Sequence, residues 1–212
     1  MLTLAVDTTE AWGSIALADE NGVREEVLLH APEGFSHVLF GEIDALLKRR
    51  KVRLADVELF AGASGPGSFT GVRVGLSAIK GLAEVGGKLL VAMSNLRVLA
   101  EFGTSNARAT IIDAHRGEIY GALYDSLGKQ IVPETVLPFE KFRSLLPHET
   151  IEWISQAPVP GLDGPIILAP RAIAGTLARI AIRDARAGLA ADPAAIEANY
   201  VRRSDAELLF RG

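Results

Sequence analysis

The chain opens with short apolar segments that predict strands. LTLAVD (2–7) is apolar throughout and ends at Asp7, just before the polar run TTE, which is typical of a buried strand. WGSIALAD (12–19) and VREEVLLH (23–30) read as two further strands. The dipeptide Asn-Gly between them favours a tight hairpin turn. The first 30 residues therefore predict three antiparallel strands.

From Ser36 onward the apolar residues recur at helical spacing instead. The residues that carry this spacing are Val38, Leu39, Ile43, Leu46 and Leu47. Ser36 is the expected N-cap. The helix would end in KRRKVR (48–53), where cations favour a helix C-terminus and a solvated turn. A specific contact with RNA is the alternative at that segment.

The same order of elements is predicted twice along the chain. In the first half a strand (57–64), a helix from about 70 to 85, a strand (88–93) and a helix (94–103) follow. The second half predicts a strand pair (109–125), a strand interrupted by Pro133 (129–137), a helix from Pro138, a strand (165–170) and a helix (171–188). Residues 147–165 are rich in proline and glycine and predict no element.

The repeated order β-β-β-α-β-α indicates an internal duplication of topology. It predicts an α/β fold with two related lobes, at 1–105 and 106–212. Two such lobes, each opening with an antiparallel meander, suggest the actin/hexokinase/Hsp70-type architecture. Ligands in that architecture bind between the lobes.

The composition is that of a compact protein without a strong electrostatic field. Of the 212 residues 49% are hydrophobic and 23% are charged, and the formal net charge is -4, which would not attract nucleic acid over the whole surface. The absence of cysteine excludes disulfides, zinc–thiolate sites and thiol nucleophiles. With no signal peptide and no transmembrane-length apolar run in view, we expect a soluble cytoplasmic protein without a membrane partner.

The stretch SGPGSFTGVRVG (64–75) looks like a phosphate loop but fits neither standard motif. No lysine follows Gly71, as a Walker A loop requires, and Thr70 stands where a dinucleotide fingerprint needs its third glycine. What remains is a tight turn from a strand into a helix capped by Ser68 or Thr70. Three uses stay open: close packing of another helix on Gly71, Gly75 and Ala78, anion binding at the helix start, and catalysis.

Other candidate chemistry is sparse. Asp7 ends the first strand, where this architecture would place a carboxylate on the phosphate side, but Thr8 and Thr9 follow it instead of glycine. A hydroxyl-rich capped turn is the alternative there. The candidate residues for a nucleotide or anion are Asp7, Thr8, Gly67, Ser68 and Thr70. The four histidines lack metal-ligand spacing, so we predict no metal site.

A further polar cluster lies in the second half. Asp113, Arg116 and Glu118 belong to DAHRGEIY (113–120). They predict either a charged hairpin or a polar rim that faces a cleft or a partner.

Four stretches together resemble the TsaB family, also called YeaZ. GPGSFTGVRVG (65–75) is similar to the family's glycine signature, and LAVDTT (4–9), DAHRGEIY (113–120) and NYVRRSDAE (199–207) agree in the same order. The family helps to make threonylcarbamoyladenosine on tRNA. The resemblance implies a two-lobed protein of the actin/hexokinase/Hsp70 type that acts as a non-catalytic platform.

The resemblance also implies partners. TsaB-like proteins pair with the catalytic subunit TsaD, and the ATPase TsaE joins the pair. We therefore expect no catalytic residue, metal or cofactor on this chain alone, ATP use by the complex, and tRNA contact only through the complex. The implied partner-binding residues lie on two N-terminal helices: Ser36, Leu39, Phe40, Ile43, Phe69, Thr70, Val72, Arg73, Gly75 and Leu76.

Two alternatives remain. The same helices could pair two copies of this chain in a homodimer. The chain could also be an enzyme in its own right, a glycoprotease-like peptidase or an ATPase of the same fold.

Overall fold

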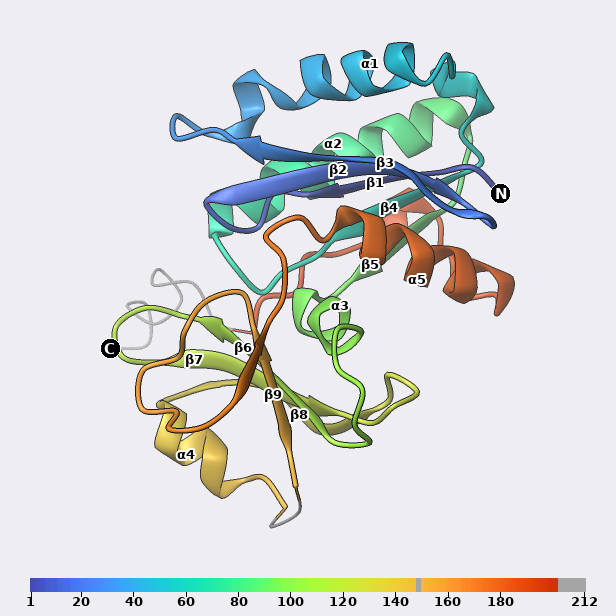
Figure 1. Cartoon of the computed structure of the whole chain (residues 1–212). Coiled ribbons are helices and arrows are strands. Elements are labelled where there is room, and N and C mark those ends of the chain that lie inside the picture. The colour runs from blue at the N-terminus through green and yellow to red at the C-terminus, as the bar shows by residue number, and fades with distance from the viewer. Residues whose placement is uncertain (148–149, 202–212) are drawn as a thin grey trace. The chain divides into compact units, whose positions relative to one another are not determined.

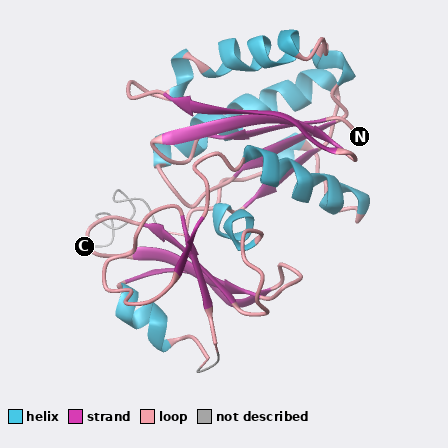
Figure 2. Ribbon diagram, in the orientation of Figure 1, coloured by secondary structure: helices cyan, strands magenta, loops and turns pink. Residues whose placement is uncertain are grey.

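The chain folds into two compact units, each built on one five-stranded sheet (Figure 1 and Figure 2). The computed structural model describes residues 1–147 and 150–201. The first unit consists of Met1–Val98 and Pro170–Ala198. The second consists of Leu99–Ala169 and the described residues 199–201.

The first sheet confirms the predicted antiparallel opening. Its strands are β1 (Thr3–Asp7), β2 (Trp12–Asp19), β3 (Gly22–His30), β4 (Leu59–Ala63) and β5 (Leu90–Met93). They lie in the order β3-β2-β1-β4-β5, with β1 antiparallel to β2 and parallel to β4. All five residues of β1 are buried, because this central strand is covered on both faces.

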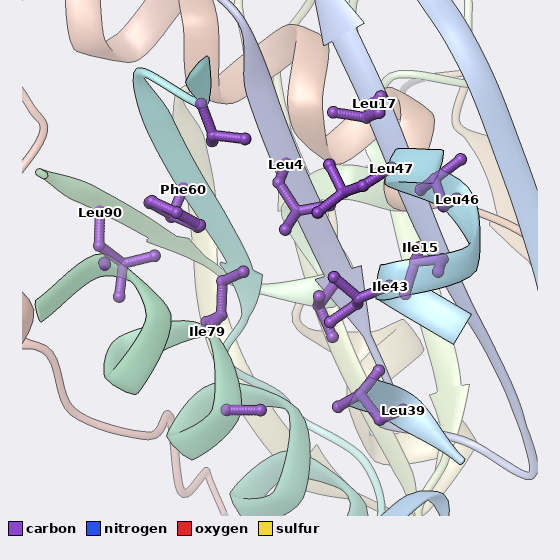
Figure 3. Close-up of a cluster of buried hydrophobic side chains, with 14 of the residues drawn as sticks. Leu4, Ile15, Leu17, Leu39, Ile43, Leu46, Leu47, Phe60, Ile79 and Leu90 are labelled. Carbon is purple, nitrogen blue, oxygen red and sulfur yellow. The ribbon is translucent and has the colours of Figure 1, made fainter. Parts of the chain in front are cut away.

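Helices cover both faces of this sheet. α1 (Leu39–Arg49) and α2 (Phe69–Gly86) lie on one face, and α5 (Ala174–Arg186) lies on the other (Figure 1). The apolar stripe of α1 is buried as its spacing predicts. Figure 3 shows Leu39, Ile43, Leu46 and Leu47 gathered with Leu4, Ile15 and Leu17 of the sheet in one core.

The predicted N-cap at Ser36 is wrong. Residues Phe35–His37 form a short 3₁₀ turn, and Val38 occupies the N-cap position of α1 without a side-chain hydrogen bond. Phe35 is buried, with its ring so close to Gly13 that a Cβ at Gly13 would lie 2.8 Å from it. Burial of this ring accounts for the extra turn before α1 begins.

The second sheet repeats the connectivity of the first. Its strands are β6 (Arg108–Asp113), β7 (Ile119–Tyr124), β8 (Gln130–Leu137), β9 (Glu152–Ser155) and β10 (Ile166–Leu168), and α4 (Phe139–Ser144) follows β8. The order β10-β9-β6-β7-β8 mirrors that of the first sheet. This shared order confirms the predicted α/β fold with two duplicated lobes of the actin/hexokinase/Hsp70-like class.

Two details of the second sheet differ from the prediction. β9 lies inside residues 147–165, where no element was predicted. The strand escaped prediction because it has only four residues and lies in a segment rich in proline and glycine. Pro133 does not interrupt β8. This strand lies at the sheet edge, and its pairing with β7 shifts register near the proline, where a missing N–H is tolerated.

The predicted C-terminal lobe of 106–212 needs correction, because residues 170–198 belong to the first unit. α5 packs across β1 to β5. The Ser14 hydroxyl accepts hydrogen bonds from the backbone N–H groups of Ile173 (3.1 Å) and Ala174 (3.0 Å), and Glu26 accepts one from Gly175 (2.7 Å). Side chains of the first sheet thus satisfy the free N–H groups at the start of α5.

Candidate functional site

Three loops meet at one edge of the first sheet. β1, β4 and β5 are parallel neighbours, so their carboxyl ends lie together, and this edge is the usual ligand position in open α/β sheets. The loops are Asp7–Thr9, the glycine-rich turn at 64–68, and Ser94–Asn95 at the start of α3 (Asn95–Ala100). The fold therefore gathers the residues that the sequence singled out around Asp7 and Gly67.

Asp7 is the centre of a buried hydrogen-bond network. It is 2% exposed, and its Oδ1 accepts from the Thr9 backbone N–H (3.0 Å), the Thr9 hydroxyl (2.7 Å) and Asn95 Nδ2 (3.4 Å). Asn95 also donates to Thr9 Oγ1 at 2.6 Å and accepts from the Gly65 N–H at 3.2 Å. A single amide side chain thus ties all three loops together.

Sequence reasoning missed Asn95. The available signal was its position, directly after an apolar strand and at the first turn of a helix, which is where this fold brings loops together. Nothing local in the sequence connects it with Asp7, which lies 88 residues away.

Burial raises the pKa of Asp7 above its ordinary value of 3.8. Loss of solvation is the largest cause, and it outweighs the hydrogen bonds from Thr9 and Asn95 that favour the charged form. Between pH 3.8 and the raised pKa the folded protein holds a proton that the unfolded chain has lost. Stability contributed by this group is therefore fully present below pH 3.8 and is lost as the pH rises through the raised pKa.

Asp7→Asn is expected to remove this pH dependence. An asparagine oxygen can accept the same hydrogen bonds, yet it carries no charge to desolvate. The stability of the variant relative to the parent should therefore increase as the pH rises from below 3.8 through the raised pKa. Urea unfolding of both proteins across this pH range measures the difference, with Asp163→Asn, at an exposed carboxylate, as the control. Parallel stability curves for Asp7→Asn and its parent would contradict the prediction.

Gly71 and Gly75 pack against Thr8 of the same chain. A Cβ at Gly71 would overlap the Thr8 carbonyl oxygen, and a Cβ at Gly75 would overlap the Thr8 hydroxyl oxygen. That hydroxyl donates to the Gly71 carbonyl at 2.7 Å. The predicted use of this stripe, the close approach of another helix, is therefore corrected: the space beside these two glycines is filled by the turn after β1.

The turn after β1 occupies part of the predicted anion site. Ser68 caps α2 as predicted, with its hydroxyl accepting from the Gly71 N–H at 3.3 Å, while the Ser68 N–H donates to the Thr9 carbonyl at 2.6 Å. A Cβ at Gly67 would also overlap the Thr9 carbonyl oxygen. Asp7 and Thr8 are only 2% and 1% exposed, so the prediction that they line an open anion site is wrong.

Two of the donors at the start of α2, the N–H groups of Ser68 and Gly71, are already used. Binding of an anion at Gly67 and Ser68 stays a prediction. Thr70 is exposed and takes no part in the network around Asp7.

The residues predicted to bind a partner divide by burial. Five are exposed, namely Ser36, Phe40, Phe69, Thr70 and Arg73. Five are buried within the first unit, namely Leu39, Ile43, Val72, Gly75 and Leu76. The prediction that the buried five contact a partner is wrong, because their side of each helix packs on the sheet.

The exposed residues lie at one end of the unit. The Phe35 ring packs on Gly13 and the start of α2 is bonded to Thr9, so α1 and α2 both begin beside the β1–β2 turn (Figure 1). Phe40 is 56% exposed and Phe69 46%. The Arg73 guanidinium lies 3.7 Å from the centre of the Phe69 ring, in a cation–π arrangement. Large exposed aromatic side chains with an adjacent arginine are typical of protein interfaces.

The polar cluster of the second unit forms a strained hairpin between β6 and β7. His115 and Arg116 have positive φ angles of 60° and 57°, a conformation that costs non-glycine residues about 1 kcal/mol each. Asp113 Oδ1 accepts from the His115 N–H at 2.8 Å and supports the turn. The charged hairpin is thus present, with Asp113 and His115 exposed.

The described residues offer neither a metal cluster nor a membrane span. Within 1–147 and 150–201, no three His, Asp or Glu side chains converge so as to hold a metal ion. In the same part of the chain, no helix combines the length and the apolarity needed to cross a membrane. Of the stretches quoted for the family resemblance, residues 202–207 of NYVRRSDAE lie outside the described residues.

Comparison with known proteins agrees with the sequence motifs. Residues 30–167 match the family model described as TsaD, tRNA N6-adenosine threonylcarbamoyltransferase. The chain is 33% identical over 139 residues to the tRNA threonylcarbamoyladenosine biosynthesis protein TsaB of Bacillus subtilis, and 33% identical over 129 residues to that of Escherichia coli. These matches cover 63% and 58% of this chain, and 61% and 55% of the two relatives.

Solved structures extend the similarity over the whole fold. A Pseudomonas aeruginosa protein described as similar to peptidase YEAZ superposes with a TM-score of 0.80 at 25% identity, covering 95% of this chain and 99% of its own. YeaZ from the same organism gives a TM-score of 0.77 at 23% identity, covering 94% and 99%. The chain belongs to the TsaB (YeaZ) family, within the group of proteins that the TsaD family model describes.

Proposed function

We propose that this chain is a non-catalytic platform subunit in the synthesis of threonylcarbamoyladenosine on tRNA. It would bind and support a TsaD-type catalytic subunit, together with a TsaE-type ATPase. The observation that carries the proposal is the state of Asp7, whose buried Oδ1 is occupied by donors from Thr9 and Asn95. A carboxylate held in this way stabilises loops and is not open to a substrate.

The exposed aromatic residues support a partner at the start of α1 and α2. Phe40 and Phe69 expose about half of their surface, whereas nearby apolar residues such as Leu39 and Val72 are buried in the core. The proposed TsaD-type contact would cover these rings. A second copy of this chain could cover them instead, so homodimer and heterodimer would compete for one face.

The proposal includes no nucleotide bound by this chain alone. ATP would be used by the complex, and titration of ATP into the isolated chain should show no saturable heat. Because the substrate of the complex is tRNA, the proposed role places the chain in the cytoplasm.

Reconstitution of tRNA modification tests the proposed function. Purified partners should form threonylcarbamoyladenosine on a tRNA transcript at least about tenfold faster with this chain than without it, since the platform holds the catalytic subunit in its active complex. Asp7→Asn should support the same rate as the parent, because Asp7 is structural. An equal rate without the chain would overturn the proposal.

The alternative of an independent peptidase has its own outcome. The purified chain would cleave peptides, and Asp7→Asn would abolish that cleavage. This pair of results would replace the platform proposal with an enzyme.

A further inference from the structure

A basic groove lies in the first unit, between the β2–β3 hairpin and the end of α1. It has a volume of about 500 Å³. The hairpin contributes Asp19, Asn21 and Arg24, and the helix end contributes Arg49, Arg50 and Lys51. It belongs to neither the Asp7 network nor the aromatic face at the start of α1 and α2.

The charge in the groove is opposite to that of the whole chain. Four cationic side chains and one carboxylate line it. Glu25 approaches Arg49 and Arg50 from β3, at 2.7 Å and 3.9 Å. Four positive charges against these two carboxylates leave an excess of two, on a chain whose formal net charge is -4. Such a local excess attracts a phosphate more strongly than the net charge suggests.

Two of the arginines are held in place by carboxylates. Arg24 Nε donates to Asp19 Oδ2 at 2.7 Å, and Arg49 Nε donates to Glu25 Oε1 at 2.7 Å. Among the described residues this is the only hydrogen bond that the Arg49 guanidinium makes, so its terminal N–H groups remain available for a phosphate. An arginine fixed in this way loses less conformational freedom when it binds an anion.

Helix capping explains only part of the basic segment. Lys48 and Arg49 lie in the last turn of α1, where cations stabilise the helix dipole, and Lys48 pairs with Asp44 at 2.6 Å. Arg50 and Lys51 lie beyond the helix. Lys51 has a positive φ of 55°, a conformation that glycine adopts more readily, and no carboxylate among the described residues pairs with it.

We propose that this groove binds the phosphate backbone of the tRNA on which the complex acts. The inference rests on the proposed function, which supplies RNA as the polyanion. Arginine forks match phosphate oxygens, and phosphate contacts provide most of the sequence-independent affinity for nucleic acid. α1 has 11 residues, so the groove lies about 16 Å along the helix from Phe40.

The test compares a groove variant with a matched control of equal charge change. The groove variant is Arg50→Glu with Lys51→Glu. The control is Lys129→Glu with Lys141→Glu, two exposed lysines of the second unit. Fluorescence anisotropy measures binding of a labelled, unmodified tRNA transcript to the complex with the TsaD-type subunit, at several salt concentrations. Thermal unfolding confirms that both variants fold.

The groove variant should bind tRNA about tenfold more weakly than the control at 100 mM salt. The plot of log association constant against log salt concentration should become less steep than that of the parent by about 1.5 to 2, because two phosphate contacts are lost. Inorganic phosphate and ATP at millimolar concentration serve as competing probes. If either displaces tRNA from the parent as effectively as unlabelled tRNA does, the groove is a small-anion site and the proposal is overturned.

Binding to the TsaD-type subunit is measured separately for both variants. Unchanged partner binding with weakened tRNA binding supports the groove. Equal tRNA affinity and salt slope for groove and control variants overturn the groove proposal and leave the platform role standing. If the parent chain itself neither binds the partner nor promotes modification, the proposed function fails, and the groove proposal fails with it.

Discussion

Replacing Gly75 with leucine is expected to lower the free energy of unfolding of the first unit by about 4 kcal/mol. Even the first carbon of the new side chain would overlap the Thr8 hydroxyl oxygen. Relief of this overlap requires the Thr8 side chain or α2 to move, and either movement breaks the buried hydrogen bond from Thr8 to Gly71. Both the overpacking and the lost hydrogen bond contribute to the expected effect.

Gly81→Leu is the matched control, because it makes the same change on the same helix. Gly81 is exposed, and nothing lies within 4 Å of the position of its Cβ. The variant should be more stable than the parent by about 0.5–1 kcal/mol, since leucine is a better helix former than glycine. The two substitutions are therefore expected to shift stability in opposite directions.

Tryptophan fluorescence during urea unfolding measures the effect in the correct unit. The chain has two tryptophans, Trp12 in the first unit and Trp153 in the second. In a Trp153→Phe background only Trp12 reports, and it stacks on His30 at 4.1 Å between ring centres. Equal unfolding midpoints for Gly75→Leu and Gly81→Leu would show that the contact with Thr8 relaxes without cost.

This result also decides how partner binding can be tested. A weaker complex with Gly75→Leu would report the damage to the fold and not the loss of a contact. Substitutions at the interface must therefore be made at exposed positions.

The glycine-rich helix shows where prediction from sequence succeeds and where it ends. Small residues at helical spacing correctly indicate that something approaches closely. They do not say what approaches, and the neighbour of Gly71 is Thr8, 63 residues earlier in the chain. Local periodicity predicts that one face of the helix allows close packing, whereas the identity of the neighbour that packs there depends on the tertiary fold.

Helix ends show the same division. The buried stripe of α1 follows from its own residues, so its position was predictable. The Ser14 hydroxyl accepts a hydrogen bond from the Ile173 N–H at the start of α5. The two residues lie 159 positions apart, so no local motif could indicate that bond. The assignment of residues 170–198 to the first unit was unpredictable for this reason.

The candidate site follows the same rule. Asp7 and the glycine-rich turn could be singled out because each ends an apolar strand. Their closure by Asn95 depends on the parallel order of β1, β4 and β5, which the sequence alone did not establish.

The second large effect is expected at the aromatic face. Phe40→Ala and Phe69→Ala should each weaken binding to a TsaD-type subunit by about 30-fold, because buried aromatic anchors are typical hot spots of interfaces. The double variant should weaken it by more than about 100-fold, with the exact sum depending on how the two rings share one pocket. Since both rings are about half exposed, the free energy of unfolding should change by less than about 1 kcal/mol.

Val85→Ala is the control for this pair. Val85 is an apolar residue of the same unit, 87% exposed, at the C-terminal end of α2. It is more accessible than the aromatic residues but lies at the other end of the helix. Its substitution should leave partner affinity unchanged, which separates the aromatic face from exposed apolar surface in general.

Calorimetric titration measures the affinity for the catalytic partner, and sedimentation measures self-association of the same variants. If one face serves both associations, the double variant should lose the homodimer together with the heterodimer. Loss of only one of them would show that the two associations use different surfaces. A partner affinity that survives in the double variant but falls with Val85→Ala would move the interface to the far end of α2. The start of α1 and α2 would then have no role in binding the catalytic subunit.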